Sequence, residues 1–397
     1  MNKKLLSDRV KNMAESATLQ MAQMARDMQS QGLDIINMSL GEPDFDTPQD
    51  IKEAAKKALD DGYTKYTPVP GLPLLREAIK EKFKRDNNLD YGIDQIVVTN
   101  GAKQAIANVC LAMLNPGDEV ILFAPYWVSY DSIIKVAGGV PVKVYAGIDA
   151  NFKVSPQQLK DAITSRTKLV LFSSPSNPTG SVYTGEELKA LAMVLKDYPD
   201  IYIISDEIYE YINFGTGHSS IASFDFIKDR VIVVNGMSKG FAMTGWRIGY
   251  MASNTDIAKS CIKIQGQFTS GANAFGQVAA AYALHHGKYE YMIRKFDERR
   301  KVFINNLSGI KGFKVNEPQG AFYLFPDISY YFGKSNGKTV IKDAVDFSAA
   351  LLKYAHVATV PGDPFGAPGC VRFSYATSMD KIVEATKRIK AFMEDFA

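Results

Sequence analysis

The chain has 397 residues, of which 46% are hydrophobic and 22% are charged, as is usual for a globular protein of roughly two to three domains. Its 46 lysine and arginine residues nearly balance 43 aspartate and glutamate residues, and no long basic block occurs, which argues against nucleic-acid binding. No apolar run is long enough to span a membrane, and charged residues interrupt any signal-peptide core, so we expect a cytoplasmic protein without membrane or nucleic-acid partners.

Seven apolar segments are predicted to be strands, and patterns of helical spacing separate most of them. Alternation of strand and helix from residue 95 to residue 252 predicts one α/β domain with a largely parallel sheet. Only 13 residues (235–247) separate the last two strands, which leaves little room for a helical crossover, so the seventh strand should run antiparallel. The predicted strands are 95–99, 119–123, 140–144, 168–172, 201–204, 231–234 and 248–252.

The two ends of the chain are predicted to lie outside this sheet. We expect a large domain of residues 49–289 and a smaller one that combines residues 1–48 with residues 290–397. The C-terminal part should begin with a long charged helix at 289–307, continue with short strands around 321–325 and 369–375, and end with a helix at 379–396.

Small and aromatic residues follow the first two predicted strands. Gly101, Ala102 and Lys103 come after strand 95–99 and begin a helix, where exposed backbone N–H groups favour a bound phosphate. Trp127 follows strand 119–123 and is placed to stack on a flat ligand, although a tryptophan of the core is an equally common reading.

Polar residues follow the strands at 168–172 and 201–204. Asn177 begins an Asn-Pro-Thr-Gly segment, which is usually only a turn but which offers an amide donor to a ring oxygen. Asp206 would pair with a protonated ring nitrogen, and Tyr209, three residues later, would donate to the same ring oxygen. The alternative for Asp206 is a helix N-cap.

A lysine in a Ser-Lys pair follows the sixth strand, 231–234, and an arginine comes eight residues later. The amine of Lys239 would form a Schiff base with an aldehyde, and Ser238 and Arg247 would bind a phosphate. Open α/β sheets bind ligands at the carboxyl ends of their strands, and five strand ends here each suit one part of pyridoxal 5'-phosphate. The alternative is a surface Ser-Lys pair with an unrelated arginine.

The chain resembles the class I/II aminotransferases of the fold-type I pyridoxal-phosphate enzymes, and most of all the bacterial aspartate aminotransferases of the Iβ type. The resemblance covers nearly the whole chain: Leu-Gly-Glu-Pro-Asp-Phe-Asp-Thr-Pro at 40–48, Lys-Tyr-Thr-Pro at 65–68 and Arg-Phe-Ser-Tyr-Ala at 372–376. It implies a seven-stranded, mostly parallel sheet in a large domain, with a smaller α/β domain built from both termini.

The resemblance also implies roles for single residues. Arg372 would pair with the substrate α-carboxylate rather than form an ion pair at a strand edge, and Gly41 would close over it. Tyr66 would reach the phosphate of the neighbouring subunit, which implies a homodimer with shared active sites. The cofactor would be bound by Gly101, Ala102, Trp127, Asn177, Asp206, Tyr209, Ser238, Lys239 and Arg247, with Trp127 and Asn177 also bordering the substrate.

The implied reaction moves the amino group between L-aspartate and 2-oxoglutarate, with oxaloacetate and L-glutamate as products. In the Iβ type, a Ser-Ala-Thr segment and a lysine bind the distal carboxylate, and Ser16, Thr18 and Lys103 match them. Members that accept prephenate carry a basic residue before Ser-Ala-Thr, where this chain has Glu15. Aminotransfer to aromatic substrates, prephenate or alanine, and a β-lyase reaction on the same fold, are the alternatives.

Two further function classes are disfavoured, and no metal site is expected. A transcription regulator with an aminotransferase-like domain needs a DNA-binding domain, and a nicotinamide dehydrogenase needs a glycine fingerprint that is absent. The four histidines have no metal-ligand spacing. Cys110, Cys261 and Cys370 are odd in number and have apolar neighbours, so we expect reduced residues in the core.

Overall fold

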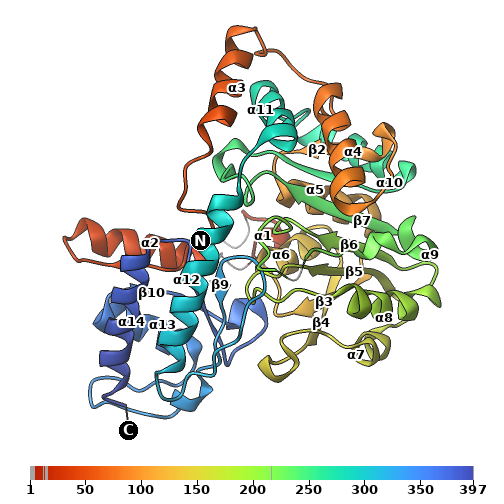
Figure 1. Ribbon diagram of the computed structural model, residues 1–397. Coiled ribbons are helices and arrows are strands. Elements are labelled where there is room, and N and C mark those ends of the chain that lie inside the picture. The colour runs from red at the N-terminus through yellow and green to blue at the C-terminus, as the bar shows by residue number, and fades with distance from the viewer. Residues whose placement is uncertain (1–4, 12, 14–16, 216, 397) are drawn as a thin grey trace.

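A seven-stranded sheet forms the centre of the larger part of the molecule (Figure 1). The structure is a computed structural model that describes residues 5–11, 13, 17–215 and 217–396. The spatial order of the strands is β2-β8-β7-β6-β5-β3-β4. Their bounds are β2 (Ile96–Thr99), β3 (Glu119–Ala124), β4 (Val140–Tyr145), β5 (Thr167–Ser173), β6 (Tyr202–Asp206), β7 (Val231–Gly236) and β8 (Gly249–Ala252).

The seven predicted strands are all present, and their ends differ from the predicted ends by no more than two residues. Neighbouring strands pair in parallel except β8, which is antiparallel to both β7 and β2. The prediction of a returning seventh strand is therefore confirmed. Its cause is the short connection after β7, which cannot carry the chain back across the sheet through a helix.

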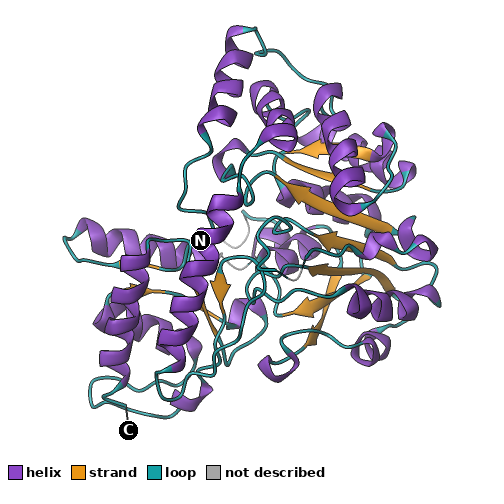
Figure 2. Ribbon diagram, viewed as in Figure 1, coloured by secondary structure: helices purple, strands orange, loops and turns teal. Residues whose placement is uncertain are grey.

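Helices cover both faces of the sheet, as the layers in Figure 2 show. Side chains alternate along each strand, so Val231 and Val233 pack on one face while Ile232 and Val234 pack on the other. The first face is covered by α3 (Gln49–Asp60), α4 (Pro73–Asn87), α7 (Pro156–Ala162), α8 (Gly185–Lys196), α9 (Asp225–Lys228) and α11 (Ala274–His286). The second is covered by α5 (Ala102–Met113), α6 (Ser129–Val136) and α10 (Thr255–Phe268).

The two ends of the chain pack together beside this sheet. Strand β1 (Ile36–Asn37) pairs in parallel with β10 (Val357–Ala358), and a small antiparallel sheet has the order β11-β12-β9. Met21 and Ala25 share an apolar cluster with Leu352 and Ala358. The remaining elements are α1 (Asp8–Lys11), α2 (Ala17–Ser30), α12 (Glu290–Ser308), β9 (Tyr323–Leu324), α13 (Ala344–Ala350), β11 (Val360–Pro361), β12 (Val371–Ser374) and α14 (Met379–Met393).

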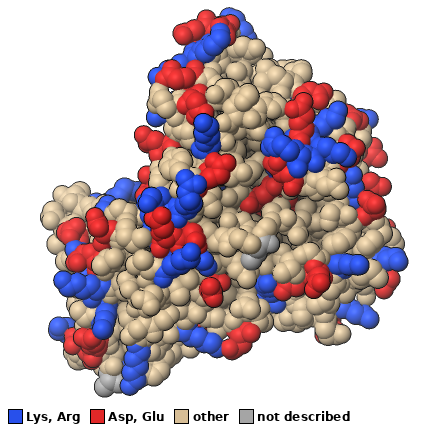
Figure 3. Space-filling model, in the orientation of Figure 1, with Lys and Arg blue, Asp and Glu red and all other residues tan. Residues whose placement is uncertain are grey.

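The distribution of surface charge and the state of the cysteines match what the sequence predicted. On the face drawn in Figure 3, acidic and basic side chains are interspersed and neither sign forms a continuous field. All three cysteines are free and buried, as predicted from their apolar neighbours. Within the described part of the chain, no helix is both long and apolar enough to cross a membrane.

Candidate active site

A cavity of about 470 Å³ lies at the carboxyl ends of the parallel strands, between the sheet and the part formed by the two chain ends. It brings together residues that are far apart in the sequence, from Thr18 to Arg372. The residues of the sequence analysis that line it are Thr18, Gly41, Ala102, Lys103, Trp127, Asn177, Asp206, Tyr209, Ser238, Lys239, Arg247 and Arg372.

Two predicted residues of the described chain, Gly101 and Tyr66, do not line the cavity. Gly101 is the N-cap residue of α5 and directly precedes Ala102, which does line it. Tyr66 is fully exposed in the single chain, on a loop between α3 and α4. Ser16 lies outside the described residues, so its predicted contact with a distal carboxylate stays a prediction.

The beginning of α5 forms one end of the cavity, where backbone and guanidinium groups come close together. Gly101 has φ 79°, and a Cβ atom there would lie 2.4 Å from Nη2 of Arg247. A Cβ atom at Gly249 would lie 2.3 Å from the amide nitrogen of Ala102. Glycine at both positions therefore lets β8 and Arg247 approach the N-terminus of α5. This end of the cavity combines helix N–H groups with a cation, which is an arrangement that binds phosphate.

Lys239 follows β7 and points across the cavity toward the N-terminal segment. Its ammonium group donates a hydrogen bond to the carbonyl oxygen of Gly41. Burial lowers the pKa of Lys239 to about 8; the carboxylate of Glu42 opposes the shift, and the cations Arg372 and Arg247 add to it. An amine with a lowered pKa is more easily deprotonated near neutral pH, so it is better suited to act as a nucleophile and a base.

Glu42 is a residue of this site that the sequence analysis assigned no role. It lines the cavity, and its carboxylate accepts a hydrogen bond from Oγ1 of Thr244 at 3.0 Å. The two residues are 202 positions apart in the sequence. The hydrogen bond joins the segment at 40–48 to the loop that carries Lys239. The only feature of the sequence that pointed to Glu42 was its position directly after Gly41.

Asp206 lies at the end of β6 and is almost fully buried. Its Oδ2 atom accepts a hydrogen bond from the hydroxyl of Tyr130 at 2.6 Å, and its Oδ1 atom accepts one from the amide of Ile208 at 3.1 Å. Burial raises the pKa of Asp206 to about 6, while these two donors limit the rise. Sequence reasoning assigned no role to Tyr130, although it comes three residues after Trp127.

Arg372, in β12, is a buried cation that forms no ion pair with any acidic side chain of the described residues. Its Nη1 donates to Oδ1 of Asn177 at 3.0 Å, and its Nη2 donates to the carbonyl oxygen of Ser39 at 2.6 Å. Its Nε atom is buried and has no hydrogen-bond partner among the described residues. The described residues therefore give no support to the alternative of a strand-edge ion pair. A guanidinium that is buried without a carboxylate is poised to receive an anionic ligand.

Lys103 and Trp127 also line the cavity and contact each other. The ammonium nitrogen of Lys103 lies 4.8 Å from the centre of the Trp127 ring, within range of a cation–π interaction. Partial burial lowers the pKa of Lys103, and the charge of Arg247 adds to the effect. Among the described residues, the charged side chains that line the cavity are four basic ones, Lys103, Lys239, Arg247 and Arg372, and two acidic ones, Glu42 and Asp206. This excess of positive charge suits a ligand with several anionic groups.

Tyr209 lines the cavity one turn after Asp206, and its hydroxyl shares a 2.7 Å hydrogen bond with that of Tyr323. Glu207, which follows Asp206, and Glu210, which follows Tyr209, do not line the cavity. The segment after β6 thus presents Asp206 and Tyr209 to the cavity and turns its two glutamates toward the protein interior.

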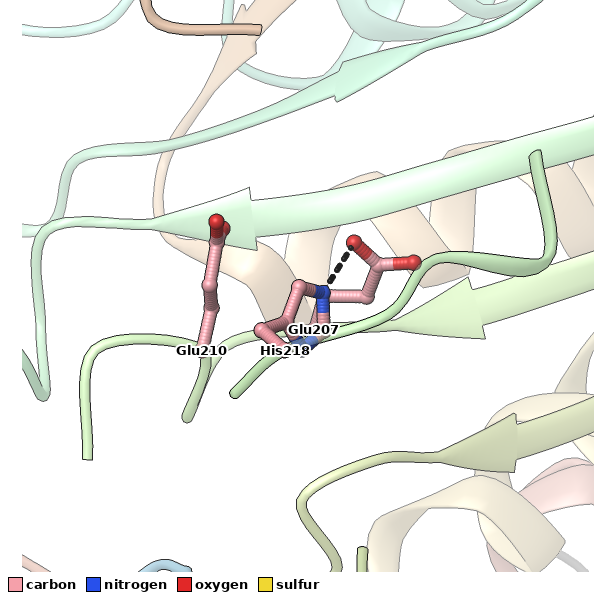
Figure 4. A group of neighbouring side chains, drawn as sticks. All are labelled: Glu207, Glu210 and His218. Atoms are coloured by element: carbon pink, nitrogen blue, oxygen red, sulfur yellow. Dashed lines mark hydrogen bonds and ion pairs between the residues drawn. The ribbon is translucent and has the colours of Figure 1, made fainter. Parts of the chain in front are cut away.

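Glu207, Glu210 and His218 lie close enough together to be considered as metal ligands (Figure 4). However, both carboxylates already have partners within the protein, and of the His218 ring nitrogens only Nδ1 has none among the described residues. Glu207 accepts hydrogen bonds from Ser205 and Ser220, at 2.9 and 2.6 Å, and is paired with His218 at 2.9 Å. Glu210 is paired with the buried ammonium of Lys82 and accepts hydrogen bonds from Asn87 and Asn235. Together with Lys82, the three side chains form a buried ion-pair network.

The chain belongs to the class I and II aminotransferases, whose family model matches residues 33–389. It is 47% identical over 396 residues to the aspartate aminotransferase of Bacillus sp. strain YM-2, covering 99% of this chain and 100% of that relative. It is 45% identical over 392 residues to a probable aspartate/prephenate aminotransferase of Rickettsia bellii, covering 97% of this chain and 98% of that relative.

Solved structures show the same relationship. The aspartate aminotransferase of Rhizobium meliloti matches with a TM-score of 0.95 and 39% identity, covering 99% of both chains. That of Thermus thermophilus with maleate matches with a TM-score of 0.92 and 40% identity, covering 98% of this chain and 99% of that one. The protein is therefore an enzyme with the fold of these aminotransferases, as the resemblance implied.

Proposed function

We propose that this aminotransferase uses pyridoxal 5'-phosphate to move the amino group between L-aspartate and 2-oxoglutarate. The observation that carries the proposal is the set of side chains that line one cavity. It combines Lys239, with a lowered pKa, and the buried carboxylate of Asp206 with Arg372 and Lys103, two cations that form no ion pair among the described residues. Relatives named aspartate aminotransferase support the choice of substrate.

The residues present fit the cofactor. The N–H groups at the start of α5, Ser238 and Arg247 would hold its phosphate, and Asp206 would pair with its ring nitrogen. Lys239 would bind its aldehyde carbon. When bound, the cofactor supplies an electron-withdrawing ring that stabilises negative charge on the substrate α-carbon. Lys239 would then carry the proton that leaves that carbon and return it in the second half of the exchange.

Two sets of side chains would bind the two carboxylates of a dicarboxylic substrate. Arg372 and Asn177, joined by a hydrogen bond of 3.0 Å, would bind the α-carboxylate, with Gly41 beside them. Lys103 and Thr18, which also line the cavity, would bind the distal carboxylate. The Thermus thermophilus structure that carries maleate, which is a dicarboxylate, supports a site for such ligands.

We further infer a homodimer and a division into two domains. Tyr66 is fully exposed, and Arg247 is exposed as well, so the phosphate end of the cavity is open in the single chain. This supports a second subunit whose Tyr66 completes the site. The β1–β10 pairing and the cluster of Met21 with Leu352 support a small domain of residues 1–48 and 290–397 beside a large domain of residues 49–289.

A spectroscopic and a kinetic experiment test the function. The purified protein should show a visible absorption band of bound cofactor that changes when L-aspartate is added. With 2-oxoglutarate present, oxaloacetate should form, and its reduction by malate dehydrogenase can be followed. L-alanine, L-phenylalanine and prephenate serve as competing substrates, and pyruvate release from cystathionine would reveal a β-lyase. Preference for any of these over aspartate would contradict the proposed substrate.

A further inference from the structure

Tyr130 is a buried residue that joins two walls of the cavity. It lies in the first turn of α6, is 1% exposed, and donates its hydroxyl hydrogen to Oδ2 of Asp206 at 2.6 Å. Its ring meets the ring of Trp127 edge-on, with centroids 5.4 Å apart and an interplanar angle of 89°. One side chain therefore contacts both the carboxylate at the end of β6 and the aromatic residue after β3.

The protonation states make the direction of this hydrogen bond definite. Burial, together with the nearby charge of Asp206, raises the pKa of Tyr130 far above its usual value, so the phenol stays protonated and donates. Burial raises the pKa of Asp206 to about 6, and the hydrogen bond from Tyr130 is the largest effect in the opposite direction. The other charged groups that act on Asp206 are Glu207, the next residue, and Lys239, from the loop after β7.

This inference rests on the proposed function. We propose that Tyr130 is a positioning residue, which holds the Asp206 carboxylate as an anion in the orientation that serves the cofactor ring. Tyr130 need not touch substrate or cofactor to do so. Its hydroxyl acts through Asp206, and its ring supports Trp127 from the side. Without the hydroxyl, one oxygen of a buried carboxylate loses its strongest donor and the neutral acid becomes the favoured form.

The chain offers a matched pair of substitutions. Tyr130→Phe keeps the ring and its packing and removes only the hydroxyl. Tyr250 is also a fully buried tyrosine of the large sheet region, but its hydroxyl has no hydrogen-bond partner among the described residues. Tyr250→Phe is therefore the control for the loss of a buried phenol hydroxyl. A chain with 3-fluorotyrosine at position 130 carries a stronger donor of nearly the same size and tests the opposite direction.

The holoenzymes are compared by steady-state kinetics across pH. In Tyr130→Phe we expect kcat with aspartate to fall about 10- to 150-fold, the range of a hydrogen bond to a charged group, while KM changes little. The acidic limb of the kcat profile should move up by about one to two pH units, because Asp206 then loses its proton only at higher pH. The fluorotyrosine enzyme should move the same limb down, and Tyr250→Phe should leave it in place.

A second measurement does not depend on activity. Both tryptophans, Trp127 and Trp246, lie near the site, so quenching of their fluorescence reports binding of pyridoxal 5'-phosphate to the apoenzyme. Tyr130→Phe should bind the cofactor more weakly below neutral pH, and the defect should shrink as the pH rises and Asp206 ionises.

The outcomes separate this inference from the proposed function. If wild type and Tyr250→Phe transaminate aspartate while Tyr130→Phe keeps the wild-type acidic limb, Tyr130 has only a packing role and the inference is overturned. The same conclusion follows if the fluorotyrosine enzyme fails to shift the limb, a test that stands even where Tyr130→Phe folds poorly. If wild type itself shows no transamination and no cofactor band, the proposed function fails first.

Discussion

Lys239 is the residue on which the proposed chemistry depends, because its amine lines the cavity and lies close enough to Asp206 to act on the charge of that buried carboxylate. Lys239→Ala should still bind the cofactor through the phosphate and ring contacts but should lose transaminase activity by several orders of magnitude. In the wild type, borohydride reduction followed by peptide mass analysis should place the pyridoxyl mass on the peptide that contains Lys239. A label on Lys103 or on any other lysine would remove Lys239 from its role.

Lys103 is expected to select dicarboxylic substrates. Its side chain is exposed in the single chain, so solvent weakens its interaction with a carboxylate. A hydrogen bond to a charged group contributes about 1.5–3 kcal/mol, and we expect Lys103→Ala to lie at the lower end, with about a tenfold loss of kcat/KM for aspartate. L-alanine has no distal carboxylate and serves as the matched control. Equal losses for both substrates would mean that Lys103 only adds charge near the phosphate.

At the scale of single residues, the sequence predicted which residues at the ends of strands would come together in one cavity. Asn177, Asp206 and Lys239 do line it, because the ends of parallel strands meet at one edge of a sheet. Tyr130 was missed because its partner Asp206 is 76 positions away and nothing local distinguishes it from a core tyrosine. The fully exposed Tyr66 was assigned by resemblance alone, since nothing in its local sequence indicates a contact across subunits.

At the scale of elements, the segment after β6 is anchored from behind by the buried pair of Lys82 and Glu210. Lys82→Met would leave the buried Glu210 carboxylate without its ammonium partner, which should lower the free energy of unfolding by about 3–5 kcal/mol. Lys80→Met is the control on the same helix, because Lys80 is 43% exposed and its ion pair with Glu77 should contribute less than about 1 kcal/mol. Urea unfolding of both variants measures the difference, and similar losses would contradict a special role for the buried pair.

The elements themselves were largely predictable, because the strands of a covered parallel sheet are continuous apolar runs. The antiparallel direction of β8 was predictable from the short connection between β7 and β8. The buried position of Lys82 did not follow from the sequence, since a lysine in the charged helix at 73–87 is usually a solvated residue. What overrides that expectation is the pairing with Glu210, which is 128 positions away.

At the scale of the whole molecule, the proposed shared site makes a prediction about mixed dimers. Lys239→Ala and Tyr66→Ala subunits should each form inactive or severely impaired homodimers. A hybrid dimer has one site with both defects and one site with neither, because Lys239 comes from one subunit and Tyr66 from the other. Random reassociation of equal amounts makes half of the dimers hybrid, so about a quarter of the wild-type activity should return.

The control for this experiment is a mixture of two variants whose substituted residues belong to the same subunit's part of the active site. The chosen mixture is Lys239→Ala with Asp206→Ala, because both residues line the cavity of a single chain. Each site of their hybrid dimer then carries one of the two defects. That mixture should therefore stay inactive. The mixtures are refolded together and assayed with aspartate and 2-oxoglutarate. If the Lys239→Ala and Tyr66→Ala mixture gains nothing over its separate components, Tyr66 does not complete the neighbouring site, and its full exposure needs another explanation.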